Sequence, residues 1–264
     1  MRGLRRCVNE CYNGGHYLTN ILVFTPYRVG STTLCNLLAS NFDFKVIWED
    51  PRRLDTIRFY SCSERGLVVK GHTQIKLIFD EGIIFDYLLI VIRDPYSMYP
   101  SCYFKDITNR NYSYYYGNME DVIKAPMEHL IEHFLTFKWD EIIIANYEFY
   151  FSQIKEHMGI DLWKSGFDKE RGFQFYGSES GLDRVGVIHI NKLNDGSAVT
   201  SFFETMNLYN NKLLLRNDNS AKDKFYYEKY KNFLNQLPKS YFERYKFAND
   251  KVLEHFGSEI ERNI

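Results

Sequence analysis

Short apolar runs recur along the chain, and each of them predicts a buried strand. These runs are rich in β-branched and aromatic residues, and turn-forming or charged residues bound them, which is typical of strands. The runs cover residues 21–24, 42–48, 66–69, 87–92 and 185–190. The same pattern indicates one further short strand at 212–215.

Helical spacing of apolar residues separates these runs. It begins after residue 31 and recurs over 95–104, 119–137, 139–157, 197–206, 223–235 and 239–256, whereas 1–19 and 159–176 have the composition of irregular segments. We therefore expect a single α/β domain over residues 1–264: a P-loop-like parallel sheet flanked by helices, with a helical insertion at about 106–160 and a helical C-terminus. Pro100 is expected to kink or shorten the helix at 95–104.

The segment that joins the first strand to the first helix carries the clearest chemistry. After the strand come Pro26-Tyr27-Arg28-Val29-Gly30, and a helix then begins on Ser31, Thr32 and Thr33. The unpaired N–H groups of a helix's first turn attract anions, and an arginine can bind two oxygens at once. The pattern predicts a phosphate- or sulfate-binding loop, and the alternative is a plain turn with a surface arginine.

This loop differs from a Walker A loop, in which a lysine follows the last glycine directly. Here Ser31 follows Gly30, and the cation, Arg28, comes two residues before that glycine. The order of residues argues against an ordinary ATPase or kinase.

Polar side chains also follow the other predicted strands. Glu49 and Asp50 follow the strand at 42–48, and Lys70 and His72 follow the strand at 66–69. The carboxyl ends of parallel strands meet at one edge of a sheet, so we expect these groups near Arg28. A neutral imidazole can take a proton from an attacking hydroxyl, although each group also suits an ordinary loop.

The strand at 87–92 leads into Arg93-Asp94-Pro95, where Asp94 suits a helix N-cap and Pro95 the first helical position. Ser101 lies eight residues after Arg93. Arg93 and Ser101 are positioned to reach one anion together, and the alternative is a structural turn.

Composition narrows the class of protein further. The chain of 264 residues has a formal net charge of −1, which indicates no overall affinity for nucleic acid. Five cysteines without a C-x-x-C pair favour free thiols in a reducing compartment. No apolar run is long enough to span a membrane and the first residues lack a signal-peptide core, so we expect a cytoplasmic protein. His129 and His133 lie one turn apart without a third ligand, and no metal is expected.

Three segments together resemble the sulfotransferases that use 3′-phosphoadenylyl sulfate (PAPS). Arg28-Val29-Gly30-Ser31-Thr32-Thr33 resembles their 5′-phosphosulfate loop, and Arg93 with Ser101 resembles their 3′-phosphate motif. Lys70-Gly71-His72 resembles the K-T-H segment, whose histidine is the general base.

The second half of the chain is similar to the bacterial capsular polysaccharide synthesis family, which is marked by an N-K-W-Y-S motif. The similarity covers 163–176 and 185–190, and the motif itself is degenerate, reading Asp223-Lys224-Phe225-Tyr226-Tyr227. Val29 and Thr33 also depart from the serine and tryptophan of the cytosolic sulfotransferases, and the R-K-G loop of those enzymes is absent.

The resemblance implies an enzyme that moves a sulfuryl group from PAPS to a hydroxyl of a glycan or small molecule, and releases 3′-phosphoadenosine 5′-phosphate (PAP). It implies catalytic roles for Arg28, Lys70 and His72, with Glu49 or Asp50 as the alternative base. The loop residues 28–33, together with Arg93 and Ser101, would bind PAPS.

Two other classes stay open. One is a P-loop-like nucleotide-dependent kinase that uses Asp94 as its acid, and the other is a non-catalytic relative that binds a nucleotide or a glycan. The sequence shows neither the acceptor nor the oligomeric state. A hydroxyl of a surface polysaccharide or glycolipid is the acceptor that the family resemblance implies.

Overall fold

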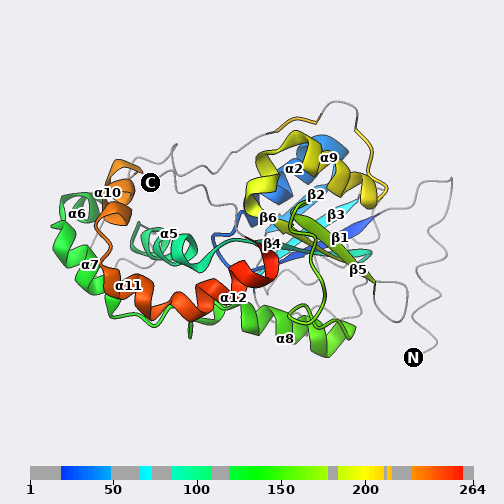
Figure 1. Cartoon of the computed structure of the whole chain (residues 1–264). Helices are drawn as coiled ribbons and strands as arrows, with labels where there is room; N and C mark the ends of the chain where they lie inside the picture. Colours follow the sequence, from blue (N-terminus) through cyan, green and yellow to red (C-terminus); the bar gives the residue numbers. More distant parts are fainter. Residues whose placement is uncertain are drawn as a thin grey trace.

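A computed structural model describes residues 19–48, 66–72, 85–108, 119–177, 184–210, 213–215 and 227–257. In these ranges the chain is an α/β protein with a six-stranded, mainly parallel sheet flanked by helices (Figure 1). The strands are β1 (Asn20–Phe24), β2 (Lys45–Trp48), β3 (Leu67–Gly71), β4 (Tyr87–Ile92), β5 (Phe173–Gly177) and β6 (Arg184–His189). Their order is β2-β3-β1-β4-β6-β5, and only the β5–β6 pair is antiparallel. The expected α/β fold, with a mainly parallel sheet flanked by helices, is confirmed.

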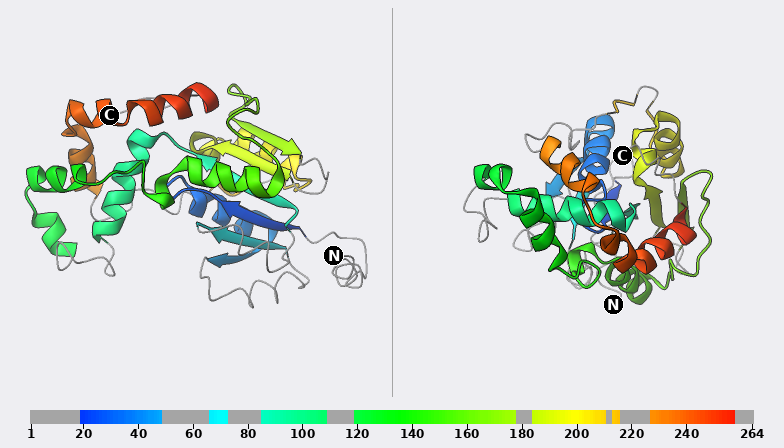
Figure 2. Two further views of the ribbon diagram at one scale, coloured as in Figure 1. Left: turned by 90° about the horizontal axis from the view of Figure 1, so that it is seen from below. Right: turned by 60° about the vertical axis from the view of Figure 1, so that its left-hand side comes forward.

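Helices cover both faces of the sheet and extend beyond one end of it. α2 and α9 lie on one face and α8 on the other, while α6, α7, α10 and α11 lie beyond α5, away from the sheet (Figures 1 and 2). The helical elements are α2 (Ser31–Phe42), α5 (Pro95–Thr108), α6 (Met119–Lys124), α7 (Met127–Leu135), η3 (Ile143–Ala145), α8 (Tyr147–Met158), η4 (Ile190–Asn194), α9 (Gly196–Thr205), α10 (Tyr227–Asn235), α11 (Lys239–Arg244) and α12 (Lys246–Phe256).

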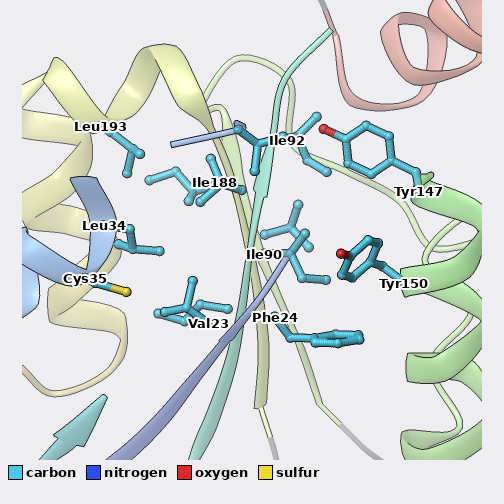
Figure 3. Packing of buried hydrophobic residues seen from close by; sticks show 14 of the residues in the cluster. Val23, Phe24, Leu34, Cys35, Ile90, Ile92, Tyr147, Tyr150, Ile188 and Leu193 are labelled. Carbon is cyan, nitrogen blue, oxygen red and sulfur yellow. The ribbon is translucent and has the colours of Figure 1, made fainter. Parts of the chain in front are cut away.

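The central strands are buried on both faces, which explains why their sequences are continuous apolar runs rather than alternating ones. Successive residues of a strand point to opposite sides, so Val23 faces Cys35 of α2 while Phe24 faces Tyr150 of α8 (Figure 3). The rings of Phe24 and Tyr150 have centroids 4.8 Å apart. α8, which the sequence assigned to an insertion, is therefore part of the sheet's own core.

We call the helices α5, α6, α7, α10, α11 and α12 the helical annex. Aromatic side chains fill its interior: Tyr103 of α5 packs on Phe233 of α10 at a centroid distance of 5.7 Å, and Phe134 of α7 packs on Trp139 at 5.3 Å. Many of the chain's 42 Phe and Tyr side chains (21 of each) thus build this second core rather than a ligand surface.

Pro100 does not shorten α5, which continues to Thr108. A proline here cannot donate to the carbonyl of Tyr96, four residues earlier. The Tyr241 hydroxyl donates to that carbonyl instead, at 2.9 Å. A side chain from the annex thus replaces the backbone hydrogen bond that proline removes.

Some expectations about secondary structure were wrong. The helix expected over 139–157 begins only at Tyr147, and the helix expected over 119–137 is divided into α6 and α7. Residues 173–176 of the segment expected to be loop-like belong to β5, because they pair with β6 at the edge of the sheet. Residues 213–215 form no strand: the backbone N–H of Leu214 donates to Asn41 Oδ1 at 2.7 Å, and Asn41 Nδ2 donates to the Leu214 carbonyl at 3.2 Å. One side chain of α2 satisfies groups that a strand would pair with a neighbour.

β1 and β4 are parallel neighbours, but the strands that follow them are added on opposite sides of this pair. The chain leaves β1 through α2 toward β2 on one side, and it leaves β4 toward β6 on the other side. In open α/β sheets, ligands bind outside the carboxyl ends of the strands at such a point. The carboxyl ends of β1 and β4 lead here into the segments that carry Arg28 and Arg93. None of the described helices is both long and apolar enough to cross a membrane.

Candidate anion-binding site

The loop between β1 and α2 provides no side-chain cap for the backbone N–H groups in the first turn of α2. Gly30 precedes the helix with a φ of 99°, in the left-handed region, and no side chain caps the first turn. A Cβ on Gly30 would also come within 3.1 Å of Ile190, so glycine suits both the conformation and the space. The N–H groups at the start of α2 are thus available to an anion.

Arg28 holds a backbone conformation that is unusual for a residue with a side chain, with a φ of 62°. Its Nε donates to Ser101 Oγ of α5 at 3.1 Å. The loop thus carries a guanidinium group from β1 toward the start of α5. Non-glycine residues in this region cluster at functional sites, where the surrounding structure holds them.

Arg93 comes to the same place from the end of β4. Its Nη1 donates to the Arg28 carbonyl at 2.7 Å, and its Nε donates to Ser97 Oγ at 2.8 Å. The Tyr147 hydroxyl fixes the Arg93 backbone, because it accepts from the N–H and donates to the carbonyl, each at 2.8 Å. Burial raises the pKa of Tyr147, which keeps this hydroxyl protonated and able to donate.

No carboxylate forms an ion pair with Arg28 or Arg93 in the part of the chain that the structure describes. Asp94 is adjacent, but its carboxylate accepts from the backbone N–H of Ser97 at 2.8 Å and from the Ser97 hydroxyl. It therefore caps α5. Two partly buried guanidinium groups without an acid between them favour an anionic ligand.

Lys70 of β3 supplies a third cation, at the start of α2. Its Nζ donates to Thr32 Oγ1 at 3.0 Å and lies 5.3 Å from the ring centre of Trp48. The indole of Trp48 is 41% exposed at the carboxyl end of the edge strand β2. The loop before α2 contains no lysine, and Lys70 of the neighbouring strand β3 supplies one at the N-terminus of this helix.

His72 follows β3 and is only 3% exposed. Its Nδ1 lies 2.6 Å from the Thr25 carbonyl, which can only accept, so Nδ1 carries the proton. Nε2 is buried, and no described group makes a hydrogen bond to it. The ring lies on that of Tyr27 with centroids 4.1 Å apart.

Burial, reinforced by the charge of Lys70, lowers the pKa of His72 to about 3. The imidazole is therefore neutral at physiological pH, with a lone pair on Nε2. The Tyr150 hydroxyl donates to the backbone carbonyl of His72 at 3.0 Å and fixes this residue against α8.

The structure brings ten of the predicted positions to one edge of the sheet: residues 28–33 of the loop and first helical turn, together with Lys70, His72, Arg93 and Ser101. Arg93 and Ser101 were expected to act as a pair, but the Ser101 hydroxyl contacts Arg28, and Arg93 contacts Ser97. Val29 is fully buried, and the hydroxyl residues Ser31, Thr32 and Thr33 occupy the first turn of α2. Glu49 and Asp50 lie outside the described residues, as does the segment 223–226 of the degenerate motif.

Sequence reasoning missed Ser97, Thr25 and Tyr27. A signal existed for Ser97, which lies one helical turn after Arg93. Thr25 and Tyr27 became visible only through their contacts with His72 from another strand.

The described residues contain no group of three or more His, Cys, Asp or Glu side chains that could hold a metal ion. His133, one of the pair noted in the sequence, contacts the Tyr103 hydroxyl through Nδ1 at 3.0 Å.

No family model matches the chain, and no curated protein matches it. Among solved structures, the chain is similar to one described as "Molecular and structural characterization of the PezAT chromosomal toxin-antitoxin system of the human pathogen Streptococcus pneumoniae". That match has 17% sequence identity and covers 53% of this chain and 72% of the other, with a TM-score of 0.29. A TM-score this low carries no argument about fold or function.

Proposed function

We propose that the protein is a sulfotransferase that moves a sulfuryl group from PAPS to a hydroxyl of a carbohydrate, such as a surface polysaccharide or glycolipid. One observation carries the proposal: Arg28 and Arg93, neither ion-paired within the described residues, converge beside an uncapped helix N-terminus and Lys70. PAPS has two anionic groups, and this edge of the sheet offers cations and hydrogen-bond donors in two neighbouring places.

The N–H groups at the start of α2, with Lys70 and Thr32, would hold the sulfuryl group and the 5′-phosphate. Arg93, Arg28 and Ser101 would hold the 3′-phosphate. Sulfuryl transfer resembles phosphoryl transfer, in which catalysis is mostly positioning and stabilisation of charge on the oxygens. Arg28 belongs to both groups, because its backbone lies in the loop and its side chain reaches Ser101.

His72 would accept the proton of the acceptor hydroxyl at Nε2. In the free protein its low pKa makes it a weak base, and Lys70 is one cause of that low pKa. A bound sulfuryl group would offset the charge of Lys70, so the pKa of His72 would rise when the donor is present. General base catalysis of this kind contributes about 10²–10⁴-fold. Glu49 and Asp50 stay the alternative base.

Asp94 does not support the kinase alternative, because its carboxylate accepts hydrogen bonds from Ser97 and caps α5. A kinase would also depend on Mg²⁺ and would not require a 3′-phosphate. Those two properties separate the classes in solution.

The proposal is tested by incubating the protein with PAPS and a panel of mono- and oligosaccharides, and by measuring the release of PAP. We expect PAP release that depends on a saccharide acceptor, persists in a metal chelator and is lost in His72→Asn. PAP release that is equal with and without every acceptor would contradict the transfer reaction. Binding of PAP without any release from PAPS would indicate the non-catalytic relative.

A further inference from the structure

Thr25 directly follows β1, and its side chain continues the contact between β1 and β4. The parallel pairing of these strands runs up to Val23, opposite Leu89, and two residues further on it would set Thr25 opposite Val91. Pro26 has no N–H that could donate to β4. Thr25 Oγ1 instead donates to the Val91 carbonyl at 3.0 Å and accepts from the Val91 N–H at 3.2 Å. One hydroxyl thus satisfies both backbone groups of a residue in β4.

The backbone carbonyl of Thr25 is used on the opposite side, toward β3. It accepts from Nδ1 of His72, the residue that follows β3, at 2.6 Å. The sheet order β3-β1-β4 places Thr25 between these two partners, and both Thr25 and His72 are buried. The hydroxyl therefore fixes Thr25 to β4, and the carbonyl fixes the His72 ring to Thr25.

These hydrogen bonds determine which nitrogen of His72 can accept a proton. In a neutral imidazole, the nitrogen that donates a hydrogen bond keeps the proton, and the lone pair is on the other nitrogen. Because the Thr25 carbonyl accepts from Nδ1, the lone pair is on Nε2, which has no hydrogen-bond partner among the described groups. The Tyr27 ring packs on the imidazole, and the Tyr150 hydroxyl donates to the His72 carbonyl, so both residues oppose rotation of this side chain.

We propose that Thr25 is a positioning residue. Its hydroxyl, held by Val91, directs its carbonyl to Nδ1 of His72 and keeps His72 in the tautomer that accepts a proton at Nε2. Val91 lies two residues before Arg93, so the same hydrogen bonds also set His72 relative to the anion-binding arginine. The importance of Thr25 for sulfuryl transfer rests on the proposed function, whereas the tautomer of His72 can be observed in the free protein.

Thr25→Val tests this inference, because valine keeps the shape of the side chain and removes the hydroxyl. Long-range ¹⁵N–¹H NMR of the imidazole rings at pH 7 distinguishes the two neutral tautomers, and His72→Asn assigns the signals of His72. The wild type should show only the tautomer with the proton on Nδ1. In Thr25→Val the carbonyl is no longer held by Val91, so we expect the tautomer with the proton on Nε2 to appear. Thr25→Ser keeps the hydroxyl and should restore the wild-type signals.

Thr200→Val is the matched control, because the Thr200 hydroxyl donates to the Gly196 carbonyl at 2.7 Å within α9. This variant should keep the wild-type tautomer of His72. In the transfer reaction, general base catalysis contributes about 10²–10⁴-fold, so kcat for PAP release should fall by about tenfold or more in Thr25→Val, with KM for PAPS within about twofold of the wild type. A variant that is only less stable would keep the wild-type tautomer in its folded molecules.

The outcomes separate this inference from the proposed function. If Thr25→Val shows only the wild-type tautomer, the inference is wrong and the proposed function stands. A proton on Nε2 in the wild type would also overturn the inference, and that measurement needs no variant. If the tautomer changes in Thr25→Val but the wild type releases no PAP with any acceptor, the positioning of His72 stands and the sulfotransferase proposal fails. A changed tautomer with an unchanged kcat would overturn the role of Thr25 in transfer and leave Glu49 or Asp50 as the base.

Discussion

The edge of the sheet and the helical annex differ in the polar and charged side chains that they bring together. In the annex, tyrosine hydroxyls donate to backbone carbonyls: Tyr241 to Tyr96, and Tyr245 to Phe137. At the sheet edge, the first turn of α2 is uncapped and Nε2 of His72 has no described partner. Buried polar groups are normally satisfied, and exceptions require an explanation. Asn249 Oδ1 and His255 Nε2 of α12 also lack a described partner, so unsatisfied atoms alone do not separate the two regions. What distinguishes the sheet edge is that Arg28, Arg93 and Lys70 converge there beside an uncapped helix N-terminus.

The largest effect on stability should come from the annex. Phe134 is fully buried against Trp139 and Phe233, so Phe134→Ala should lower the free energy of unfolding by about 3–5 kcal/mol. PAP binding to the folded variant should stay within about twofold of the wild type. Urea unfolding and calorimetry measure the two quantities. If Phe134→Ala lost little stability but much PAP affinity, the annex rather than the sheet edge would be the ligand-binding region.

The sheet edge should show the opposite behaviour. Arg28→Ala should reduce PAP release from PAPS by about 100-fold, since it removes a cation that would position PAPS through its 3′-phosphate. Its melting temperature should change little, because Arg28 makes only one side-chain hydrogen bond in the described structure. Arg244→Ala is the matched control: that arginine donates to the Leu135 carbonyl at 3.0 Å, remote from the loop. Near-normal turnover in Arg28→Ala would contradict the role of the loop.

His72 should make the free energy of unfolding depend on pH. Its pKa falls from 6.5 to about 3 on folding, so the unfolded chain takes up the proton first as pH falls. The stability contribution of the neutral imidazole is complete above pH 6.5 and is lost progressively between pH 6.5 and 3. The loss by pH 5 is about 2 kcal/mol, from about 1.36 kcal/mol per pKa unit.

His72→Asn keeps a donor for the Thr25 carbonyl but has no group that titrates in this range. Urea unfolding at pH 7 and pH 5 should therefore show a smaller decrease in stability for this variant than for the wild type. An equal decrease in both proteins would show that His72 takes up its proton in the folded state as readily as in the unfolded one.

The smallest effect concerns Pro100. Tyr241→Phe leaves the Tyr96 carbonyl without its donor and should cost about 1–3 kcal/mol. In a Pro100→Ala background the backbone N–H of residue 100 can donate to that carbonyl, so the cost of Tyr241→Phe should fall by about 1 kcal/mol. A double-mutant cycle by urea unfolding measures the difference. Additive costs would show that the tyrosine does not replace the hydrogen bond that proline removes.

From the sequence alone it was possible to predict which polar side chains lie at the carboxyl ends of the parallel strands. Four of these side chains follow or end an apolar run: Arg28, Lys70, His72 and Arg93. Parallel strands bring such positions to one edge of the sheet. The sequence was not sufficient for β5, because an edge strand is defined by the neighbour with which it pairs.

The most direct test of the central claim is the thermal stability of the protein with PAP, ADP or ATP–Mg²⁺. PAP at a hundredfold excess over its dissociation constant should stabilise the native state by about 2.7 kcal/mol, whereas ADP and ATP–Mg²⁺ should have much smaller effects. Arg93→Ala should lose the effect of PAP, and Arg244→Ala should keep it. Stabilisation by ATP–Mg²⁺ without any by PAP would contradict the account and favour a kinase.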